Sequence, residues 1–299
     1  MPSLSARATR PVVQVFGKRL AAANSAEGLR REFGLISNLM LPARGARRDN
    51  IQLDGLQCVR MSTEAGAHTG RGVLMFHGGG YVFGTTAGYS GTAGRVAKAA
   101  RASVYLPDYA LAPEYPHPAP ARDGLKAYKA MLEKYAPDKL AVMGDSAGGG
   151  LSLATLQAAR AEGLPMPACL VLWSPWLDVA GQSESMQTNR NTEILILPPT
   201  ISRCAAWFAP KEKAADPAAS PIHGDMRGLP PTLVQVSDNE MLYNDSTRFA
   251  EAARAAGVDV TLTAERDLWH VWQLMAPLMS EARASIQQSG EFINTHAAG

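Results

Sequence analysis

The chain has few cysteines and no framework that would join them. It contains three cysteines in 299 residues, at Cys58, Cys169 and Cys204. A small, odd number without close spacing argues against a disulfide scaffold and against a cysteine-based zinc site. We therefore expect three reduced thiols, two of them in apolar runs.

Long apolar stretches are also lacking. No window approaches the roughly 18 apolar residues that a membrane span needs. Near the N-terminus Arg7, Arg10, Lys18 and Arg19 interrupt every apolar stretch, so the apolar region of a signal peptide does not form. The sequence therefore predicts a cytoplasmic protein without stable membrane insertion.

An excess of charge of one sign is lacking as well, since the formal net charge is +2. Basic residues are scattered, and the densest cluster (Arg44, Arg47, Arg48) is a weak basic patch. We therefore expect no nucleic-acid partner. What the chain does have is apolar material: 46% of its residues are hydrophobic and 19% are charged, enough for a sizeable core.

Short apolar runs alternate with helical stretches over most of the chain. Each run is typical of a buried parallel strand; the runs are Gly72–Phe76, Ala102–Leu106, Leu140–Met143, Cys169–Trp173 and Thr232–Val236. Helices are predicted between or after them, at Ala119–Tyr135, Ala147–Ala161 and Asp245–Ala256. This alternation predicts an α/β protein with a mostly parallel central sheet and helices on both faces.

Two segments do not fit the alternation. Apolar residues between Val12 and Ala21 recur at helical spacing, and a second short helix is predicted at Ala26–Phe33. The stretch from about Asp178 to Pro230 is long for a connection. We expect both to form a helical cap: residues 1–45 and 181–215 belong to the cap, and residues 46–180 and 216–299 to the core.

The strongest chemical signal is the sequence Gly144-Asp145-Ser146-Ala147-Gly148. It follows an apolar run and opens a predicted helix, which is the setting of a nucleophile elbow. Flanking glycines allow the sharp turn because they add no Cβ. The alternative, a glycine-rich turn with an incidental serine, is weakened by this strand–turn–helix setting.

A second signal is His77-Gly78-Gly79-Gly80-Tyr81, again directly after an apolar run. Consecutive glycines expose backbone N–H groups that can stabilise the negative oxygen of a tetrahedral intermediate. A phosphate-binding loop is the alternative, but neither the dinucleotide glycine spacing nor a following lysine is present. We expect the N–H groups of Gly78, Gly79 and Ala147 to form the oxyanion hole.

The general base should follow the serine in this fold, in the order serine, acid, histidine. Three histidines follow Ser146: His223, His270 and His296. His296 lies in the terminal tail, and His223 precedes the strand that should carry the acid. His270 follows the strand-like run Val258–Thr263, so order and position favour it.

The loop after Thr232–Val236 offers three acids, Asp238, Glu240 and Asp245. Aspartate is the commoner orienting residue, which favours Asp238, whereas spacing favours Glu240. Asp245 is more typical of a helix N-cap or first-turn acid.

With these motifs in place, the chain resembles the bacterial hormone-sensitive lipase family of esterases over nearly its whole length. A third stretch, Asp108-Tyr109-Ala110-Leu111-Ala112-Pro113-Glu114, is similar to a motif of that family, with Ala110 where arginine is usual. The resemblance implies an α/β-hydrolase core with a helical cap, short-chain acyl ester substrates and no cofactor or metal.

The resemblance also bears on the acid. Family members mostly place it in an aspartate-led motif, and the gap-free match here is Glu240-Met241-Leu242-Tyr243-Asn244-Asp245. A start at Asp238 would require a shift of two residues. We therefore favour Glu240 and keep Asp238 as the alternative, although glutamate departs from the usual aspartate.

These residues predict a carboxylesterase that works through a covalent acyl-enzyme. Amide or peptide hydrolysis by the same chemistry is one alternative. A non-catalytic protein that binds small ligands on the same fold is another, but some plant hormone receptors that resemble this family lack the histidine that His270 supplies here. A homodimer is also predicted, because Val258–Thr263 alternates apolar and polar residues and should be the edge strand of the sheet.

Overall fold

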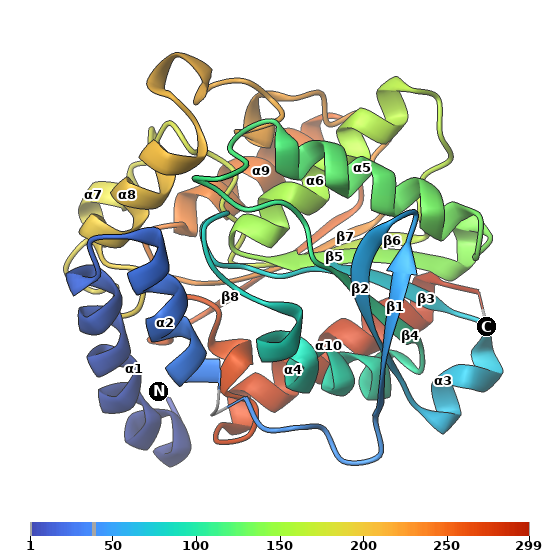
Figure 1. Cartoon of the computed structure of the whole chain (residues 1–299), viewed down its shortest axis with the longest axis horizontal. Coiled ribbons are helices and arrows are strands. Elements are labelled where there is room, and N and C mark those ends of the chain that lie inside the picture. Colours follow the sequence, from blue (N-terminus) through green and yellow to red (C-terminus); the bar gives the residue numbers. More distant parts are fainter. Residues whose placement is uncertain (1, 38–39, 299) are drawn as a thin grey trace.

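Within residues 2–37 and 40–298, which the computed structural model describes, the chain forms one eight-stranded sheet (Figure 1). The strand order is β1-β2-β4-β3-β5-β6-β7-β8. The β1–β2 and β2–β4 pairs are antiparallel and the other pairs are parallel. The strands are β1 (Arg47–Leu53), β2 (Leu56–Ser62), β3 (Gly72–Phe76), β4 (Ser103–Pro107), β5 (Leu140–Asp145), β6 (Cys169–Trp173), β7 (Thr232–Ser237) and β8 (Val260–Glu265).

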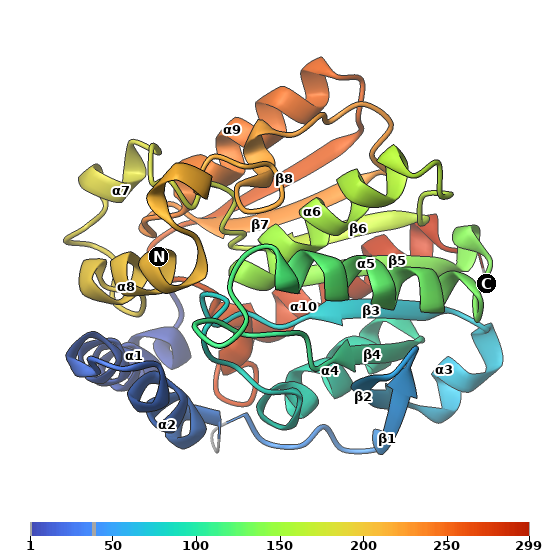
Figure 2. The ribbon, with the colours of Figure 1, turned by 45° about the horizontal axis from the view of Figure 1, so that its top comes forward.

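Helices cover both faces of the sheet. On one face lie α5 (Ala119–Leu132), α6 (Ala147–Ala161) and α9 (Tyr243–Ala255), and on the other α4 (Thr86–Ala100) and α10 (Ser280–His296) (Figure 2). The short α3 (Glu64–Thr69) packs beside α4. The predicted α/β architecture is therefore confirmed.

The interior strands form because their side chains are apolar on both faces. Every residue of β3, β5, β6 and β7 is buried, as the continuous apolar runs predicted. The edge strand β1 is mostly polar and exposed, so it carries no apolar run and was not predicted. The helix α4 contains three glycines, and it was not predicted because glycine has a low helix propensity.

The remaining helices gather at the carboxyl ends of the parallel strands. They are α1 (Leu4–Ala22), α2 (Ala26–Ser37), α7 (Ser185–Thr188) and α8 (Pro198–Phe208), all on the left of Figures 1 and 2. The Arg203 guanidinium of α8 donates hydrogen bonds to the carbonyl oxygens of Leu20 and Ala21 in α1, at 3.4 and 2.6 Å. The two expected cap segments thus meet in space. Residues 1, 38–39 and 299 of the predicted ranges lie outside the described part of the chain.

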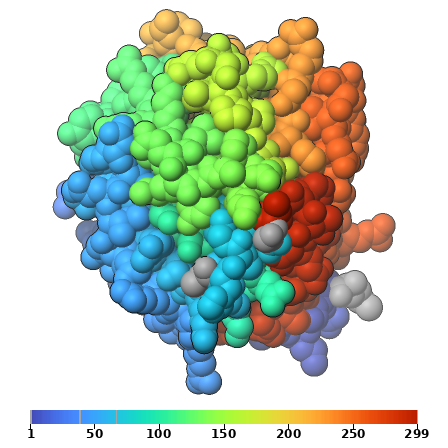
Figure 3. All heavy atoms as spheres, turned by 90° about the vertical axis from the view of Figure 1, so that its right-hand side faces the viewer, coloured from blue at the N-terminus to red at the C-terminus, as the bar shows by residue number. Residues whose placement is uncertain are grey.

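The end of the chain lies on the opposite side of the molecule, where the C-terminal segment (red) borders the segment around α3 and β3 (cyan) in Figure 3. There the Arg71 guanidinium donates to the Asn294 side-chain oxygen at 2.7 Å and to the Ala297 carbonyl at 3.1 Å. These bonds fix the end of α10 to the start of β3. None of the described helices is both long and apolar enough to cross a bilayer.

Two glycines give a matched test of packing and helix propensity. A Cβ at Gly290 of α10 would lie 2.4 Å from the Ala99 carbonyl carbon of α4, whereas a Cβ at Gly34 of α2 would meet nothing within 4 Å. We expect Gly290→Ala to lower the free energy of unfolding by about 1–3 kcal/mol because the helices are forced apart. Gly34→Ala should raise it by about 0.5–1 kcal/mol. Urea unfolding of both variants measures the difference, and equal effects would contradict it.

Candidate active site

The site is built around Ser146, which occupies the sharp turn between β5 and α6. Its backbone has φ +53° and ψ −124°, a strained conformation for a residue with a Cβ. A Cβ at Gly144 would lie 2.2 Å from the Gly148 carbonyl oxygen, and a Cβ at Gly148 would lie 2.1 Å from that of Phe76. The flanking glycines are therefore required by close backbone approach, as the elbow motif predicted.

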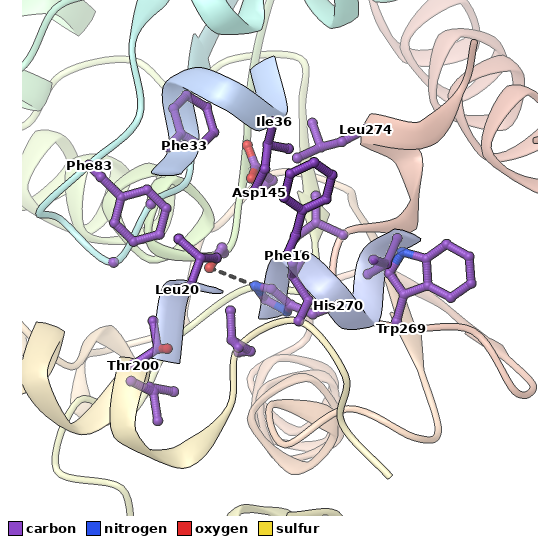
Figure 4. Close-up of a pocket in the computed structure, with 18 of the residues that line it drawn as sticks. Phe16, Leu20, Phe33, Ile36, Phe83, Asp145, Thr200, Trp269, His270 and Leu274 are labelled. Atoms are coloured by element: carbon purple, nitrogen blue, oxygen red, sulfur yellow. Dashed lines mark hydrogen bonds between the residues drawn. The ribbon is translucent and has the colours of Figure 1, made fainter. Parts of the chain in front are cut away.

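His270 connects the serine to an acid. Its Nε2 lies 2.8 Å from the Ser146 Oγ, a bond drawn as the dashed line in Figure 4, and its Nδ1 lies 2.7 Å from the Glu240 Oε2. An ionised carboxylate only accepts hydrogen bonds, so Nδ1–H must donate to Glu240. In the neutral ring this leaves Nε2 as the acceptor of the Ser146 hydroxyl proton.

Glu240 is fully buried and held at both oxygens. Its Oε1 accepts the Ser237 N–H at 2.6 Å and the Ser174 hydroxyl at 2.9 Å. The Ser174 oxygen in turn accepts the N–H of Val271 at 3.2 Å, so one hydroxyl supports both the acid and the residue after the histidine. This arrangement fixes the carboxylate in one orientation.

The loop that carries Glu240 is also braced from the stretch after β6. The Asn189 side-chain amide donates to the carbonyl oxygens of Asp238 and Glu240, at 2.8 and 3.0 Å. The Ser185 hydroxyl donates to the Met241 carbonyl at 2.6 Å. The candidate cap insertion therefore holds the acid loop in place.

The other candidate acids are engaged elsewhere. Asp238 accepts the N–H of Asp267 at 3.0 Å on the protein surface. Asp245 lies in the first turn of α9, as predicted, but its Oδ2 accepts the N–H groups of Leu177 and Asp178, at 2.8 and 2.9 Å, rather than those of its own helix. Of the three acids, Glu240 alone meets His270.

The other two histidines also lie apart from the serine. His223 is 4.0 Å from an Asp178 carboxylate oxygen, and His296 Nδ1 is 2.9 Å from the Phe292 carbonyl within α10. Chain order and position thus selected the histidine that the fold brings to Ser146.

The charges around His270 favour its protonated form. Burial by itself lowers the pKa of the imidazole, but the hydrogen bond and negative charge of Glu240, with further contributions from Glu193 and Asp145, outweigh burial. The pKa of His270 therefore lies above its ordinary value. The same charges would stabilise the imidazolium that forms when the ring takes a proton from Ser146.

The glycine loop after β3 differs from expectation at one residue. The Gly78 N–H donates to the Asp145 Oδ1 at 3.0 Å and lies 3.2 Å from the Tyr89 hydroxyl, so it is already engaged. The prediction that Gly78 provides an oxyanion donor is therefore wrong. Gly79 and Gly80 line the same pocket as Ser146, and within the described residues their N–H groups and that of Ala147 donate to no protein acceptor.

Asp145 fixes which glycine faces the pocket. Its second oxygen accepts the Tyr89 hydroxyl at 2.8 Å, so the carboxylate ties Gly78 to α4. Burial raises the pKa of Asp145 to about 7, although the bonds from Tyr89 and Gly78 and the nearby His270 oppose that shift. The Asp145 carboxylate thus accepts two buried hydrogen bonds, one from the Gly78 N–H and one from the Tyr89 hydroxyl, and these bonds hold the glycine loop in place.

The pocket above the serine is almost wholly apolar (Figure 4). Phe16 and Leu20 come from α1, Phe33 and Ile36 from α2, and Leu274 from the turn after His270. Among the described residues no group of three or more His, Cys, Asp or Glu side chains could hold a metal ion. The arrangement provides a nucleophile, a base and free N–H donors at the base of an apolar cavity.

The sequence analysis did not predict the roles of several residues that support the site. Gly80 and Asp145 stand inside the two motifs, so the motifs could have indicated them. Ser174 and Asn189 act through loop geometry that no local pattern encodes. Tyr89 lies in α4, which was not predicted.

Comparison with known proteins gives a consistent picture. Residues 73–274 match a family described as having the alpha/beta hydrolase fold. An acetyl-hydrolase of Streptomyces hygroscopicus is 38% identical over 227 residues, which is 76% of both chains. Carboxylesterase NlhH of Mycobacterium tuberculosis is 33% identical over 223 residues, or 70% of both.

Solved structures extend the similarity over nearly the whole chain. An esterase from the bacterial hormone-sensitive lipase family superposes with a TM-score of 0.92 at 33% identity, covering 97% of this chain and 99% of that one. EstE5 soaked with p-nitrophenyl butyrate superposes with a TM-score of 0.93 at 31% identity, covering 99% and 100%.

The acid can be tested by a pair of near-isosteric changes. Glu240→Gln should lower kcat by about 10⁴-fold, since the amide can present N–H where His270 needs an acceptor. Asp238→Asn should have a small effect because its carboxylate faces Asp267. Steady-state kinetics measure kcat for both variants. A large loss of kcat in Asp238→Asn, with Glu240→Gln close to the wild type, would show that Asp238 is the catalytic acid.

The pH dependence of the same variant gives an independent check. The base must be neutral, so kcat/KM falls as pH falls through the pKa of His270. Because that pKa is raised, the fall should lie above the ordinary histidine value of about 6.5. Removing the charge in Glu240→Gln should move the fall to lower pH. A profile that stays in place would show that Glu240 does not act on His270.

Asp145 should matter through the glycine loop. Asp145→Ala leaves the buried Gly78 N–H without its carboxylate, a loss of about 1–3 kcal/mol. We expect the loop to shift and kcat to fall by about 10- to 100-fold, with the fold retained. Tyr89→Phe keeps the carboxylate bond to Gly78 and should cost less. Thermal unfolding controls for folding, and an unchanged kcat in folded Asp145→Ala would refute the role.

Proposed function

Because the chain belongs to the bacterial hormone-sensitive lipase family of alpha/beta hydrolase esterases, we propose that it is a carboxylesterase with Ser146, His270 and Glu240 as its catalytic triad. The observation that carries the proposal is the buried chain of two hydrogen bonds, 2.8 and 2.7 Å long, from the Ser146 hydroxyl through His270 to Glu240.

Acylation begins when the Ser146 Oγ attacks the acyl carbon and its proton passes to the His270 Nε2. The carbonyl oxygen becomes negative and accepts hydrogen bonds from the N–H groups of Gly79, Gly80 and Ala147. The last of these is at the start of α6, where the helix dipole also favours negative charge. Glu240 keeps the imidazole in the required tautomer and stabilises its charged form.

Collapse of the tetrahedral intermediate breaks the ester bond. The His270 Nε2–H gives its proton to the departing alcohol, which leaves an acyl group on Ser146. A water molecule then loses a proton to His270 and attacks the acyl carbon, and a second collapse releases the carboxylic acid and returns the proton to Ser146. No step requires a cofactor.

We also propose that residues 1–45 and 181–215 form a cap that closes the acyl pocket. The support is the apolar lining from α1, α2 and α8 and the bonds from Arg203 that join α8 to α1. Such a lining suits an acyl chain, and among the described residues it contains no lysine or arginine that could pair with a negatively charged substrate. We propose short acyl chains, of about C4 to C6, as the preferred substrates, in keeping with the family.

A series of p-nitrophenyl esters tests the function. We expect kcat/KM to be highest for the short chains and Ser146→Ala to lose activity by about 10⁶-fold. Ser146→Ala that keeps more than about a tenth of the rate would reject the nucleophile. Faster hydrolysis of the C16 ester than of the C4 ester would overturn the chain-length preference.

We also propose, independently of the catalytic mechanism, that the protein forms a homodimer through pairing of strand β8. This strand lies at the edge of the sheet and pairs with β7 on one side, and its residues 261–265 are exposed or half-buried. An edge strand must be covered or paired. Light scattering at micromolar concentration should give twice the 31.8 kDa of one chain. A mass near that of one chain would exclude the dimer.

A further inference from the structure

The first helices of the chain carry a concentration of exposed apolar side chains. Seven large hydrophobic side chains of the described residues are exposed, and five of them lie between residues 4 and 41. On α1 these are Leu4, Val12 and Val15, with exposed fractions of 82%, 40% and 57%. Leu35 and Leu41, at 47% and 54%, belong to α2 and the segment after it.

The exposed residues of α1 form a stripe. Leu4, Pro11, Val15 and Ala22 follow one another at intervals of seven or four residues, which places them on one face of a helix. The opposite face contributes Val13, Phe16 and Leu20 to the pocket above Ser146. The helix therefore presents apolar side chains in two directions. Those of the inner face line the pocket, and those of the outer face are exposed in the described structure.

Positive charge accompanies the stripe. Residues 1–37, which end with α2, contain six basic and two acidic residues, a net charge of +4, whereas the whole chain has +2. The remainder is therefore net negative, at −2. On α1, which has no acidic residue, Arg7 and Lys18 flank the stripe, and neither forms an ion pair within the part of the chain that the structure describes.

We propose that the outer face of α1, formed by Leu4, Ala8, Pro11, Val12 and Val15 with Arg7 and Lys18, docks the protein on an anionic lipid surface. Basic side chains flanking an apolar stripe match negative headgroups above an acyl layer. The stripe is a ridge on a helix and not a groove, so it can sink into a deformable lipid surface without a partner of complementary shape. No aromatic side chain stands on it to stack with nucleic-acid bases.

Docking would place the pocket-lining helices next to the lipid. The inner face of α1 covers the serine, so its outer face would sit where apolar esters collect. This consequence rests on the proposed esterase function, whereas lipid binding does not. A binding measurement therefore separates failure of this inference from failure of the catalytic proposal.

The experiment measures co-sedimentation of the full chain with vesicles. Vesicles of equimolar phosphatidylcholine and phosphatidylglycerol should bind the protein, and vesicles of phosphatidylcholine alone should bind it much less. Raising the salt from about 0.1 M to about 1 M shortens the screening length from about 10 Å to about 3 Å and should release it.

Two double variants separate the apolar and the charged parts. Arg7→Gln with Lys18→Gln should weaken binding by about 25-fold, since each cation near such a surface contributes about fivefold. Leu4→Ser with Val15→Ser should weaken binding to the anionic vesicles without changing the charge. The matched control, Arg122→Gln with Lys134→Gln, removes two charges from α5 and the turn after it and should bind like the wild type.

Hydrolysis of soluble p-nitrophenyl butyrate should stay unchanged in all three variants, because none of these residues lines the pocket. Absence of wild-type binding to the anionic vesicles would overturn the inference, as would equal losses in the control. If instead the Leu4 and Val15 changes lower the mass in light scattering and leave vesicle binding intact, a second copy of the chain covers this face and the lipid proposal fails.

Discussion

The site depends on one buried interaction, the hydrogen bond from the His270 Nδ1 to the Glu240 Oε2. It selects the tautomer in which Nε2 accepts from Ser146, and it raises the pKa of the imidazole against the effect of burial. A buried carboxylate is costly unless its oxygens are bonded. Ser174, the Ser237 backbone and His270 meet that requirement, so the chemistry and the local stability rest on the same contacts.

The fold brings these groups together because parallel strands end at one edge of the sheet. Ser146 follows β5, Ser174 follows β6, Glu240 follows β7 and His270 follows β8. The strain of the serine turn persists because glycines on either side let the backbone approach closely. The helices above this edge provide much of the apolar lining of the pocket. The sheet thus positions the four residues, and the helices surround the serine with apolar side chains.

Much of this could be predicted from the sequence, because buried parallel strands are continuous apolar runs and the elbow is a local motif. Glu240 could be preferred to Asp238 because the loop has a fixed register to α9. Gly79 could be predicted as a donor, but the exchange of Gly78 for Gly80 could not, because Asp145 and Tyr89 set the orientation of Gly78 and the helix that carries Tyr89 was not predicted. Ser174 and Asn189 act across loops far apart in sequence. The half-exposed strands β1 and β2 carry no apolar run to reveal them.

The central claim is that Ser146, activated by His270, attacks the acyl carbon. Diethyl p-nitrophenyl phosphate tests it directly, because attack by an activated serine forms a phosphorus–oxygen bond and expels p-nitrophenolate, leaving the enzyme phosphorylated. Mass spectrometry of the intact protein should show one diethylphosphoryl group per chain, peptide mapping should place it on Ser146, and His270→Ala should abolish the labelling. Labelling of another residue, or equal labelling without His270, would contradict the account.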